Sequence, residues 1–168
     1  MDATDGGTST HDAHFRIATE ADAADLAALK VHWSHPNDPD YEVDADEAST
    51  FAGQLRDWMR ERGEQSVCIV ASVGGQMVGM AWLAIYHRAP NVGDIERLSG
   101  DVQSVFVLPA HRGRGIGEAM MQALVDEADA RGIRRVTVSS STQARPVYER
   151  VGFRVPPRLL QRELGGAV

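Results

Sequence analysis

The stretch at residues 102–117 reads Val-Gln-Ser-Val-Phe-Val-Leu-Pro-Ala-His-Arg-Gly-Arg-Gly-Ile-Gly. An apolar strand leads to Pro109, and an amphipathic helix begins directly after the glycines. Such a turn leaves backbone N–H groups unpaired at a helix N-terminus, where they suit a phosphate group. Nearby arginines add positive charge that does not titrate. The stretch therefore predicts a pyrophosphate site, built from two arginines and three glycines: Arg112, Gly113, Arg114, Gly115 and Gly117.

Other nucleotide-binding motifs share a glycine-rich turn but not this spacing. A P-loop needs Gly-Lys-Ser/Thr, and neither the lysine nor the hydroxyl residue is present here. A dinucleotide-binding turn has the pattern G-x-G-x-x-G after the first strand of the fold. This chain has G-x-G-x-G at 113–117, and its strand is not the first. Both motifs are disfavoured, and glycines with a purely structural role are the remaining alternative.

Hydrophobic periodicity predicts a mixed α/β domain around this turn. Small, polar and acidic residues at 1–13 predict a disordered tail, which leaves 14–168 as a single domain. The sheet is expected to begin near Phe15, and Gly74-Gly75 marks a two-residue hairpin. Helices are predicted at 20–34, 45–62, 115–131 and 143–151, and strands at 66–73, 76–87, 101–108, 133–139, 153–155 and 159–164.

Composition excludes several classes of protein. The net charge of −7 disfavours nucleic-acid binding, and no apolar segment is long enough to span a membrane. Cys68 is the only cysteine, so no internal disulfide can form and a cytoplasmic location is expected. His32 and His35 lack a third ligand nearby, so no metal site is expected.

The charge is unevenly distributed along the chain. Residues 14–109 hold 7 basic and 15 acidic side chains, whereas residues 110–168 hold 10 and 6. This asymmetry suits an anionic cofactor beside the glycine turn and a cationic acceptor attracted by the acidic loop at 38–47. A solvated surface without a partner explains it equally well.

Two motifs together resemble the GNAT superfamily of N-acetyltransferases. The turn at 112–117 matches the signature R/Q-x-x-G-x-G/A of that superfamily. The segment at 139–153 reads Ser-Ser-Ser-Thr-Gln-Ala-Arg-Pro-Val-Tyr-Glu-Arg-Val-Gly-Phe and resembles N-x-x-A-x-x-x-Y-E-x-x-G-F. Its Arg-Pro-x-Tyr sequence is similar to that of a bacterial subgroup. The strong resemblance covers about 101–153, and the order of elements extends it loosely over 14–164.

The resemblance implies a fold, an activity and a cofactor site. The fold would be a mostly antiparallel sheet of six to seven strands, flanked by about four helices and splayed at the fourth strand. The activity would be transfer of an acetyl group from acetyl-CoA to a primary amine of a small molecule. Pantetheine would contact the main chain of Phe106, Val107 and Leu108. The pyrophosphate would bind N–H groups of the turn, with further contacts to coenzyme A from the segment near 141–148: Arg112, Gly113, Arg114, Gly115, Ile116, Gly117, Glu118, Ser141, Arg145 and Tyr148.

The resemblance also implies catalytic roles. Tyr148 stands where the family has the general acid that protonates the departing thiolate. A backbone N–H on the strand at 101–108, that of Val107, would stabilise the developing oxyanion. Gln103 stands where the family often has a glutamate base, and glutamine cannot take a proton. Asp101 is the preferred substitute, acting through water; the alternatives are Glu96, Asp94 or no dedicated base.

The acceptor and the assembly are less constrained. The first two helices and the loops at 35–50 and 88–100 would surround the acceptor, and apolar residues near the C-terminus could support a homodimer. Two other functions remain open: an acyl-CoA-binding sensor without catalysis, and an acetyltransferase for protein or peptide amines.

Overall fold

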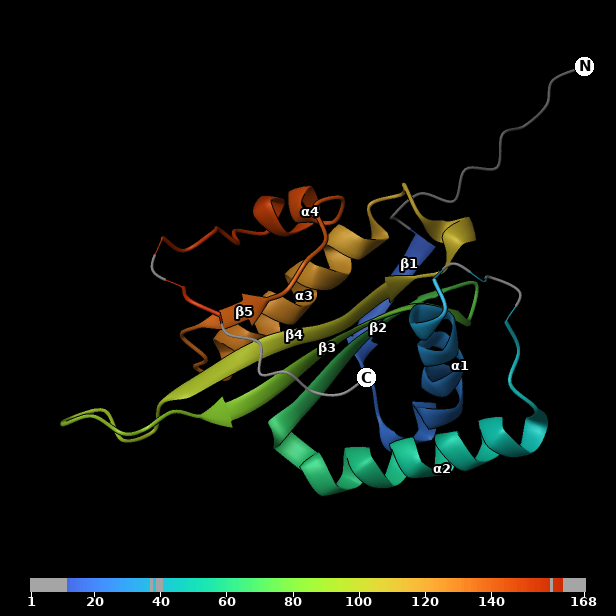
Figure 1. Cartoon of the computed structure of the whole chain (residues 1–168), viewed down its shortest axis with the longest axis horizontal. Coiled ribbons are helices and arrows are strands. Elements are labelled where there is room, and N and C mark those ends of the chain that lie inside the picture. Colours follow the sequence, from blue (N-terminus) through green and yellow to red (C-terminus); the bar gives the residue numbers. More distant parts are fainter. Residues whose placement is uncertain (1–11, 37, 39–40, 158, 162–168) are drawn as a thin grey trace, which may run out of the picture.

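The computed structural model describes residues 12–36, 38, 41–157 and 159–161 (Figure 1). In the described part of the chain, no helix is both long and apolar enough to cross a membrane. Residues 1–11 of the predicted tail lie outside the described residues, and Ala13 already belongs to the first strand. The elements are, in order, β1 (Ala13–Ile17), η2 (Glu20–Asp22), α1 (Ala23–Ser34), α2 (Ala45–Arg62), η3 (Gly63–Gln65), β2 (Ser66–Val73), β3 (Gln76–His87), β4 (Leu98–Val107), η4 (Pro109–His111), α3 (Ile116–Ala130), β5 (Val136–Val138) and α4 (Arg145–Arg150).

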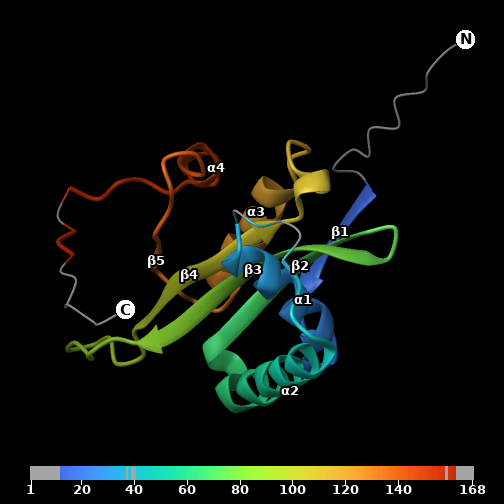
Figure 2. The ribbon, with the colours of Figure 1, turned by 45° about the vertical axis from the view of Figure 1, so that its right-hand side comes forward.

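The described strands form one sheet in the order β1-β2-β3-β4-β5. The first four strands pair antiparallel, and β5 lies parallel to β4. α1 and α2 cover one face of the sheet, and α3 and α4 lie on the other (Figures 1 and 2). Each face buries its own apolar cluster, with Met120 and Leu124 under α3 and with Leu26 and Trp82 under α1 and α2.

Local sequence signals set the bounds of α2 and of the β2–β3 hairpin. The Asp44 carboxylate caps α2 by accepting a hydrogen bond from the Glu47 N–H (2.8 Å). Gly63 follows the last residue of the helix with φ of +49°. Gly74 and Gly75 both have positive φ, +58° and +82°, as a two-residue hairpin turn of type I′ requires. The predicted helix at 45–62 and the predicted hairpin are confirmed.

The predicted count of six to seven strands is wrong, because the described sheet has five. Residues 153–155 form no strand: Phe153 packs edge-on against Tyr148, and Pro156 and Pro157 supply no N–H donors for a ladder. Residues 159–161 also lie outside any strand, and the rest of the predicted strand at 159–164 lies outside the described residues. β4 starts earlier than predicted, at Leu98, and β5 is shorter.

β4 separates from β5 halfway along its length, as expected for a sheet splayed at the fourth strand. The two strands pair only from Gly100 to Val102 on β4, which then continues to Val107 with β3 as its one partner strand among the described residues. A β-bulge lies just beyond the separation: Trp82 pairs with Gln103 but Met80 pairs with Phe106. Ser104 has a φ of +49° in this bulge, a conformation uncommon for a residue other than glycine.

An ion pair links the end of β1 to the start of the first helical segment. The Arg16 guanidinium donates two hydrogen bonds to the Asp22 carboxylate (2.8 and 2.6 Å), and the Thr19 N–H donates a third (2.7 Å). The Arg16 hydrogen bonds are the main cause that lowers the pKa of Asp22 from 3.8 to about 2. The folded state therefore holds this carboxylate ionised at pH values where the unfolded chain protonates it. This contribution to stability is complete above about pH 4 and is lost as the pH falls toward 2.

We expect Asp22→Asn to lower the free energy of unfolding at pH 7 by about 2 kcal/mol, the amount that the pKa difference represents. The variant should also lose less stability than the parent protein between pH 4 and pH 2. Urea denaturation at several pH values measures both effects. Asp25→Asn, at an exposed position of α1, is the control and should change neither. Parallel pH profiles for parent and Asp22→Asn would contradict the prediction.

Candidate active site

The glycine turn forms a cradle of N–H groups at the start of α3. Gly113 and Gly115 have φ of +74° and +76°, which residues with a Cβ rarely adopt. The first hydrogen bond of the helix runs from the Ala119 N–H to the Gly115 carbonyl (3.0 Å). The N–H groups of the four residues at 115–118 therefore have no partner inside the helix. The positive end of the helix dipole adds to their attraction for an anion.

A cavity of about 340 Å³ opens at this cradle. Besides the turn residues, its walls include His111, Val147 and Arg150, which the sequence analysis did not single out. The Arg150 guanidinium pairs with the Glu118 carboxylate and so ties α4 to the first turn of α3. α4 thus forms the wall of the cradle opposite β4.

The two arginines of the turn lie differently from the glycines. The Arg112 side chain donates from Nε to the Val107 carbonyl (2.8 Å) and lies over the Phe106 ring, 5.4 Å from its centre. Its backbone N–H donates to the Pro109 carbonyl (3.2 Å). Arg112 therefore braces the end of β4. Arg114 is half-buried beside it.

The backbone N–H and C=O groups of successive residues in β4 point alternately toward β3 and away from it. The Leu108 N–H donates to the Val78 carbonyl on β3 (2.8 Å), and Phe106 pairs with Met80. Since neighbouring residues of a strand point their N–H and C=O groups to opposite sides, Val105 and Val107 present theirs toward the gap beside β5. The Phe106 ring itself is buried under α1 and α2.

Tyr148 lies on α4, with its ring 8% exposed in the core on the α3 side of the sheet. Burial raises the pKa of its hydroxyl, so the group stays protonated at neutral pH. Among the described residues, the hydroxyl has no hydrogen-bond partner. It is therefore a protonated donor with a free hydrogen-bonding direction.

Ser141 and Arg145 stabilise α4 itself. The Ser141 carbonyl accepts hydrogen bonds from the N–H groups of Ala144 and Arg145 (3.2 and 3.1 Å), where the helix begins. The Arg145 side chain pairs with Glu149 one turn later (2.7 Å). Both residues are largely exposed.

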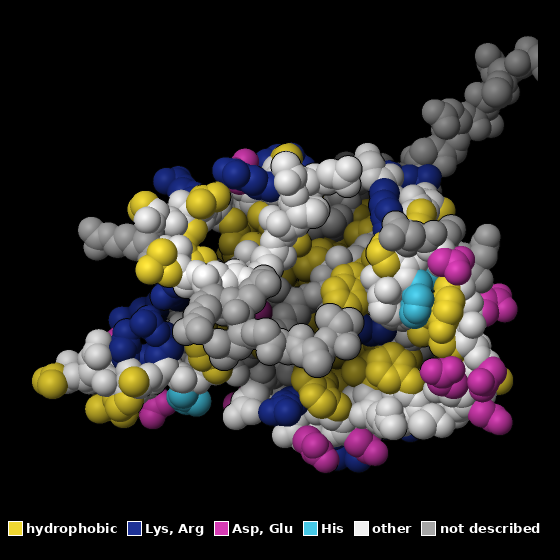
Figure 3. Space-filling view, viewed as in Figure 1, with side chains coloured by type: hydrophobic (Ala, Val, Ile, Leu, Met, Phe, Trp, Pro, Cys, Tyr) yellow, Lys and Arg dark blue, Asp and Glu magenta, His cyan; other side chains and the backbone are white. Residues whose placement is uncertain are grey.

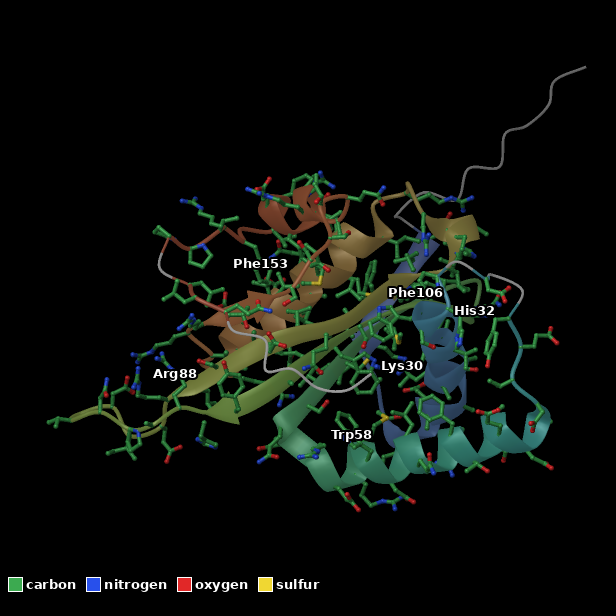
Figure 4. The ribbon with its side chains drawn as sticks, viewed as in Figure 1. Lys30, His32, Trp58, Arg88, Phe106 and Phe153 are labelled. Atoms are coloured by element: carbon green, nitrogen blue, oxygen red, sulfur yellow. The ribbon has the colours of Figure 1, made fainter. Side chains whose placement is uncertain are left out.

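The candidate bases separate into two groups. Asp101 on β4 accepts hydrogen bonds from Thr137 Oγ1 (2.7 Å) and from Gln103 Nε2 (3.3 Å). Glu96 and Asp94 lie instead in the loop between β3 and β4, the end of the molecule that Arg88 marks in Figure 4. There Glu96 lies beside His87 (3.6 Å), and Asp94 pairs with Arg97 and Arg134 (3.7 and 3.6 Å).

A second cavity, of about 330 Å³, lies between the sheet and the two helices α1 and α2. Trp58 and Lys30 reach toward this space from α2 and α1 (Figure 4), and hydrophobic side chains gather in the hollow above α2 (Figure 3). The Trp58 and Trp82 rings meet edge to face, 5.7 Å apart. The lining residues are Lys30, Phe51, Gln54, Leu55, Trp58, Ser66, Trp82, Ala84 and Gln103.

Sequence patterns placed the acceptor near the first two helices, but of the residues that line this cavity they indicated only Gln103. Phe51, Leu55 and Trp58 have the helical spacing of a buried stripe, but only Leu55 is fully buried and Trp58 stays 38% exposed. Lys30 carried one signal: it is the only lysine among 17 basic residues. Its Nζ lies 2.7 Å from Ser104 Oγ, in the bulge of β4.

The two cavities flank the same stretch of β4, residues 103–107, which is called unpaired here because its edge toward β5 has no partner among the described strands while its other edge pairs with β3. Gln103 lines the one under α1 and α2, and Val107 lines the one at the cradle. The two residues are four positions apart along the strand, no more than about 13 Å at 3.3 Å per residue. A ligand in the gap beside β4 could therefore reach from the cradle to the bulge.

Comparisons with known proteins agree with these motifs. The model of the acetyltransferase (GNAT) family matches residues 27–153. The glucosamine 6-phosphate N-acetyltransferase of Trypanosoma brucei brucei is 27% identical over 161 residues, which cover 94% of the chain and 99% of that protein. The mycothiol acetyltransferase of Amycolatopsis mediterranei is 30% identical over 105 residues, 61% of the chain and 33% of that protein.

Solved structures share the fold. The crystal structure of a predicted acetyltransferase with acetyl-CoA, from Clostridium acetobutylicum, superimposes with a TM-score of 0.66 at 23% identity, over 90% of this chain and 96% of that one. The glucosamine-6-phosphate N-acetyltransferase of Arabidopsis thaliana gives a TM-score of 0.70 at 15% identity, over 91% and 99% of the two chains. At these identities, the likeness concerns the fold alone.

Proposed function

The chain belongs to the acetyltransferase (GNAT) family and is an acyltransferase, and we propose that it uses acetyl-CoA to acetylate the primary amine of a small molecule. The observation that carries the proposal is the pair of cavities on one unpaired stretch of β4, which provides a place for each substrate. Acetyl-CoA supplies a thioester whose carbonyl an amine can attack, with a thiol as the leaving group. The names of two relatives, for glucosamine 6-phosphate and mycothiol, are consistent with a small-molecule acceptor.

The residues of the cradle fit the pyrophosphate of coenzyme A. The N–H groups at 115–118 lack helical partners, and Gly113 and Gly115 hold the turn open through their positive φ. Gly117 leaves room where a side chain would enter the cavity. Each charge-assisted hydrogen bond to a phosphate oxygen would contribute about 1.5 kcal/mol or more. Arg150 and Glu118 would close the cradle from α4 and α3.

The N–H groups of Val105 and Val107 would bind the acyl end of acetyl-CoA in the gap beside β4. One of them would donate to the thioester carbonyl oxygen as negative charge develops on it. Tyr148 would donate its proton to the departing sulfur, since its hydroxyl is protonated and has no partner in the described part of the chain. Asp101 would take the amine proton through water, because Gln103, which lies between Asp101 and the cavity under α1 and α2, cannot.

An amine-panel assay tests the proposal by following release of free thiol from acetyl-CoA. The only competing thiol is Cys68, which is 2% exposed and whose pKa is raised by burial. Amino acids, amino sugars, amino sugar phosphates, polyamines and short peptides should all be included. Thiol release together with an acetylated amine, identified by mass spectrometry, is the expected result. Tight binding of acetyl-CoA without transfer to any amine would favour a sensor instead.

The role of Asp101 has its own pH signature. We expect Asp101→Asn to lower kcat/KM at least about 10-fold at pH 7, because the amine arrives mostly protonated and loses its proton acceptor. The deficit should shrink toward pH 10, where more of the amine is already neutral. Asp94→Asn, in the distant loop, is the control and should leave the pH–rate profile unchanged. A deficit that is equally large at both pH values would show that Asp101 does not handle this proton.

A further inference from the structure

Lys30 brings an unbalanced positive charge into the cavity under α1 and α2. Its Nζ donates to Ser104 Oγ at 2.7 Å and lies 5.1 Å and 5.7 Å from the ring centres of Trp33 and Trp82. Within the described residues, no carboxylate forms an ion pair with it. Burial lowers the pKa of Lys30, which means that the surroundings compensate its charge incompletely.

The rest of the cavity wall carries no charge. Gln54, Ser66 and Gln103 are its uncharged polar residues, and the remaining walls are apolar or aromatic. Acidic side chains lie along the outer side of α2 in Figure 3, and none of the lining residues given above is acidic. A cationic acceptor, which the acidic loop at 38–47 suggested, would bring a second positive charge toward Lys30. The described cavity therefore selects against such a molecule.

We propose that the acceptor amine also carries a carboxylate, which Lys30 binds, and that the acceptor is an amino acid with an apolar side chain. This inference rests on the proposed acetyl transfer and names its substrate class. An ammonium has three donors, and Ser104 takes one, so others remain for a carboxylate. The Trp58, Trp82 and Phe51 side chains would hold the apolar part of the molecule.

Size and position support the same class. A volume of about 330 Å³ lies near the lower limit for ligand sites, which run from about 300 to 1,000 Å³. Ser104 belongs to the unpaired stretch of β4, where the amine must meet the thioester. A carboxylate held at Lys30 thus places an amine on the neighbouring carbon close to that stretch. A phosphorylated amino sugar would also suit the ammonium, but its hydroxyl groups would meet mainly apolar walls.

The test compares matched acceptors that differ in their anionic group: phenylalanine with phenylalaninol, leucine with leucinol, and glucosamine 6-phosphate with glucosamine. We expect the protein to prefer the amino acid over its alcohol by at least about 10-fold in kcat/KM, as a charged hydrogen bond implies. Lys30→Met should lower kcat/KM about 10-fold more for phenylalanine than for phenylalaninol. Lys30→Arg should retain a preference for phenylalanine. Arg62→Met removes a cation that packs on Trp58 outside the cavity, and should leave the ratio unchanged.

A second measurement does not depend on turnover. Because Lys30 is the only lysine, an amine-reactive reagent modifies just this side chain and the N-terminus, which mass spectrometry separates. N-acetylphenylalanine, which has no free amine to consume the reagent, should protect Lys30 from modification, and N-acetylphenylalaninol should not. Absence of protection, equal rates for acid and alcohol, or a preference confined to the amino sugar phosphate would overturn the inference. Protection without transfer to any amine would overturn the proposed transfer and leave the carboxylate site supported.

Discussion

Gly117→Glu should strongly weaken the binding of acetyl-CoA without destabilising the fold. An ideal Cβ at this position lies 3.8 Å from the Val107 side chain, an ordinary contact, and the residue lines the cradle cavity. A glutamate there would compete with the pyrophosphate for the N–H groups and repel its charge. Loss of two charge-assisted hydrogen bonds, about 1.5 kcal/mol each or more, corresponds to at least a roughly 100-fold rise in the KM for acetyl-CoA.

The free energy of unfolding of Gly117→Glu should rise, although its binding of acetyl-CoA weakens. Replacing a helical glycine removes a penalty of about 0.5–1 kcal/mol, and a carboxylate in the first turn of a helix is favourable. Thermal unfolding and acetyl-CoA titration measure the two effects on the same sample. Gly117→Gln adds a side chain of similar size without the charge, so it separates the steric effect from the electrostatic one. Gly53→Glu, at a helical glycine of α2 with open space around it, controls for helix propensity. A KM for acetyl-CoA in Gly117→Glu within a few-fold of the parent value would show that the cradle does not bind acetyl-CoA.

Tyr148→Phe should lower kcat by about 100-fold, the lower range for loss of a general acid, while the KM for acetyl-CoA stays nearly constant. The ring and its edge contact with Phe153 (5.8 Å between centres) remain in the variant. The hydroxyl has no partner among the described residues, so its removal should hardly change the free energy of unfolding. Steady-state kinetics with a validated acceptor, together with denaturation curves, give all three quantities.

The pH dependence adds a check on Tyr148. Burial raises its pKa, so the donor form persists through the ordinary assay range and Tyr148 should cause no loss of rate below about pH 10. Tyr86→Phe changes a tyrosine that is 47% exposed on β3 and serves as the control. If the two variants show equal kcat, another group protonates the sulfur.

The elements that sequence patterns predicted well are those with local causes. α2 begins and ends where predicted, because Asp44 supplies its cap and Gly63 its end. The turn at Gly74-Gly75 has the φ values that only glycine adopts easily. Strands near the C-terminus were predicted from the same kind of signal and are absent from 153–155. Pairing depends on a partner strand elsewhere in the chain, and no local pattern reveals whether one is available.

The same distinction between local and long-range causes applies to the candidate site. The turn and the helix start after it were predicted correctly, since both depend on residues a few positions apart, while phosphate binding at the cradle stays a prediction. Arg150 was missed there, because α4 reaches the cradle only through packing, whereas His111 lies in η4 directly before the turn and was overlooked beside the glycines. For the cavity under α1 and α2, the sequence indicated only that the first two helices would surround the acceptor. Trp58 was a residue of a helical stripe and Lys30 the only lysine, and neither pattern indicated a cavity wall.

The sequence by itself determined the glycine turn and the family resemblance, because φ angles and unpaired N–H groups follow from residues adjacent in the chain. Only the tertiary structure decided which side chain lies beside Ser104 in β4. Lys30 and Ser104 are 74 residues apart, and their contact depends on how α1 crosses the sheet and on the bulge between Gln103 and Phe106. Register and crossing are set by the packing of the whole core, so the charge in the cavity under α1 and α2 could not be read from the residues around it.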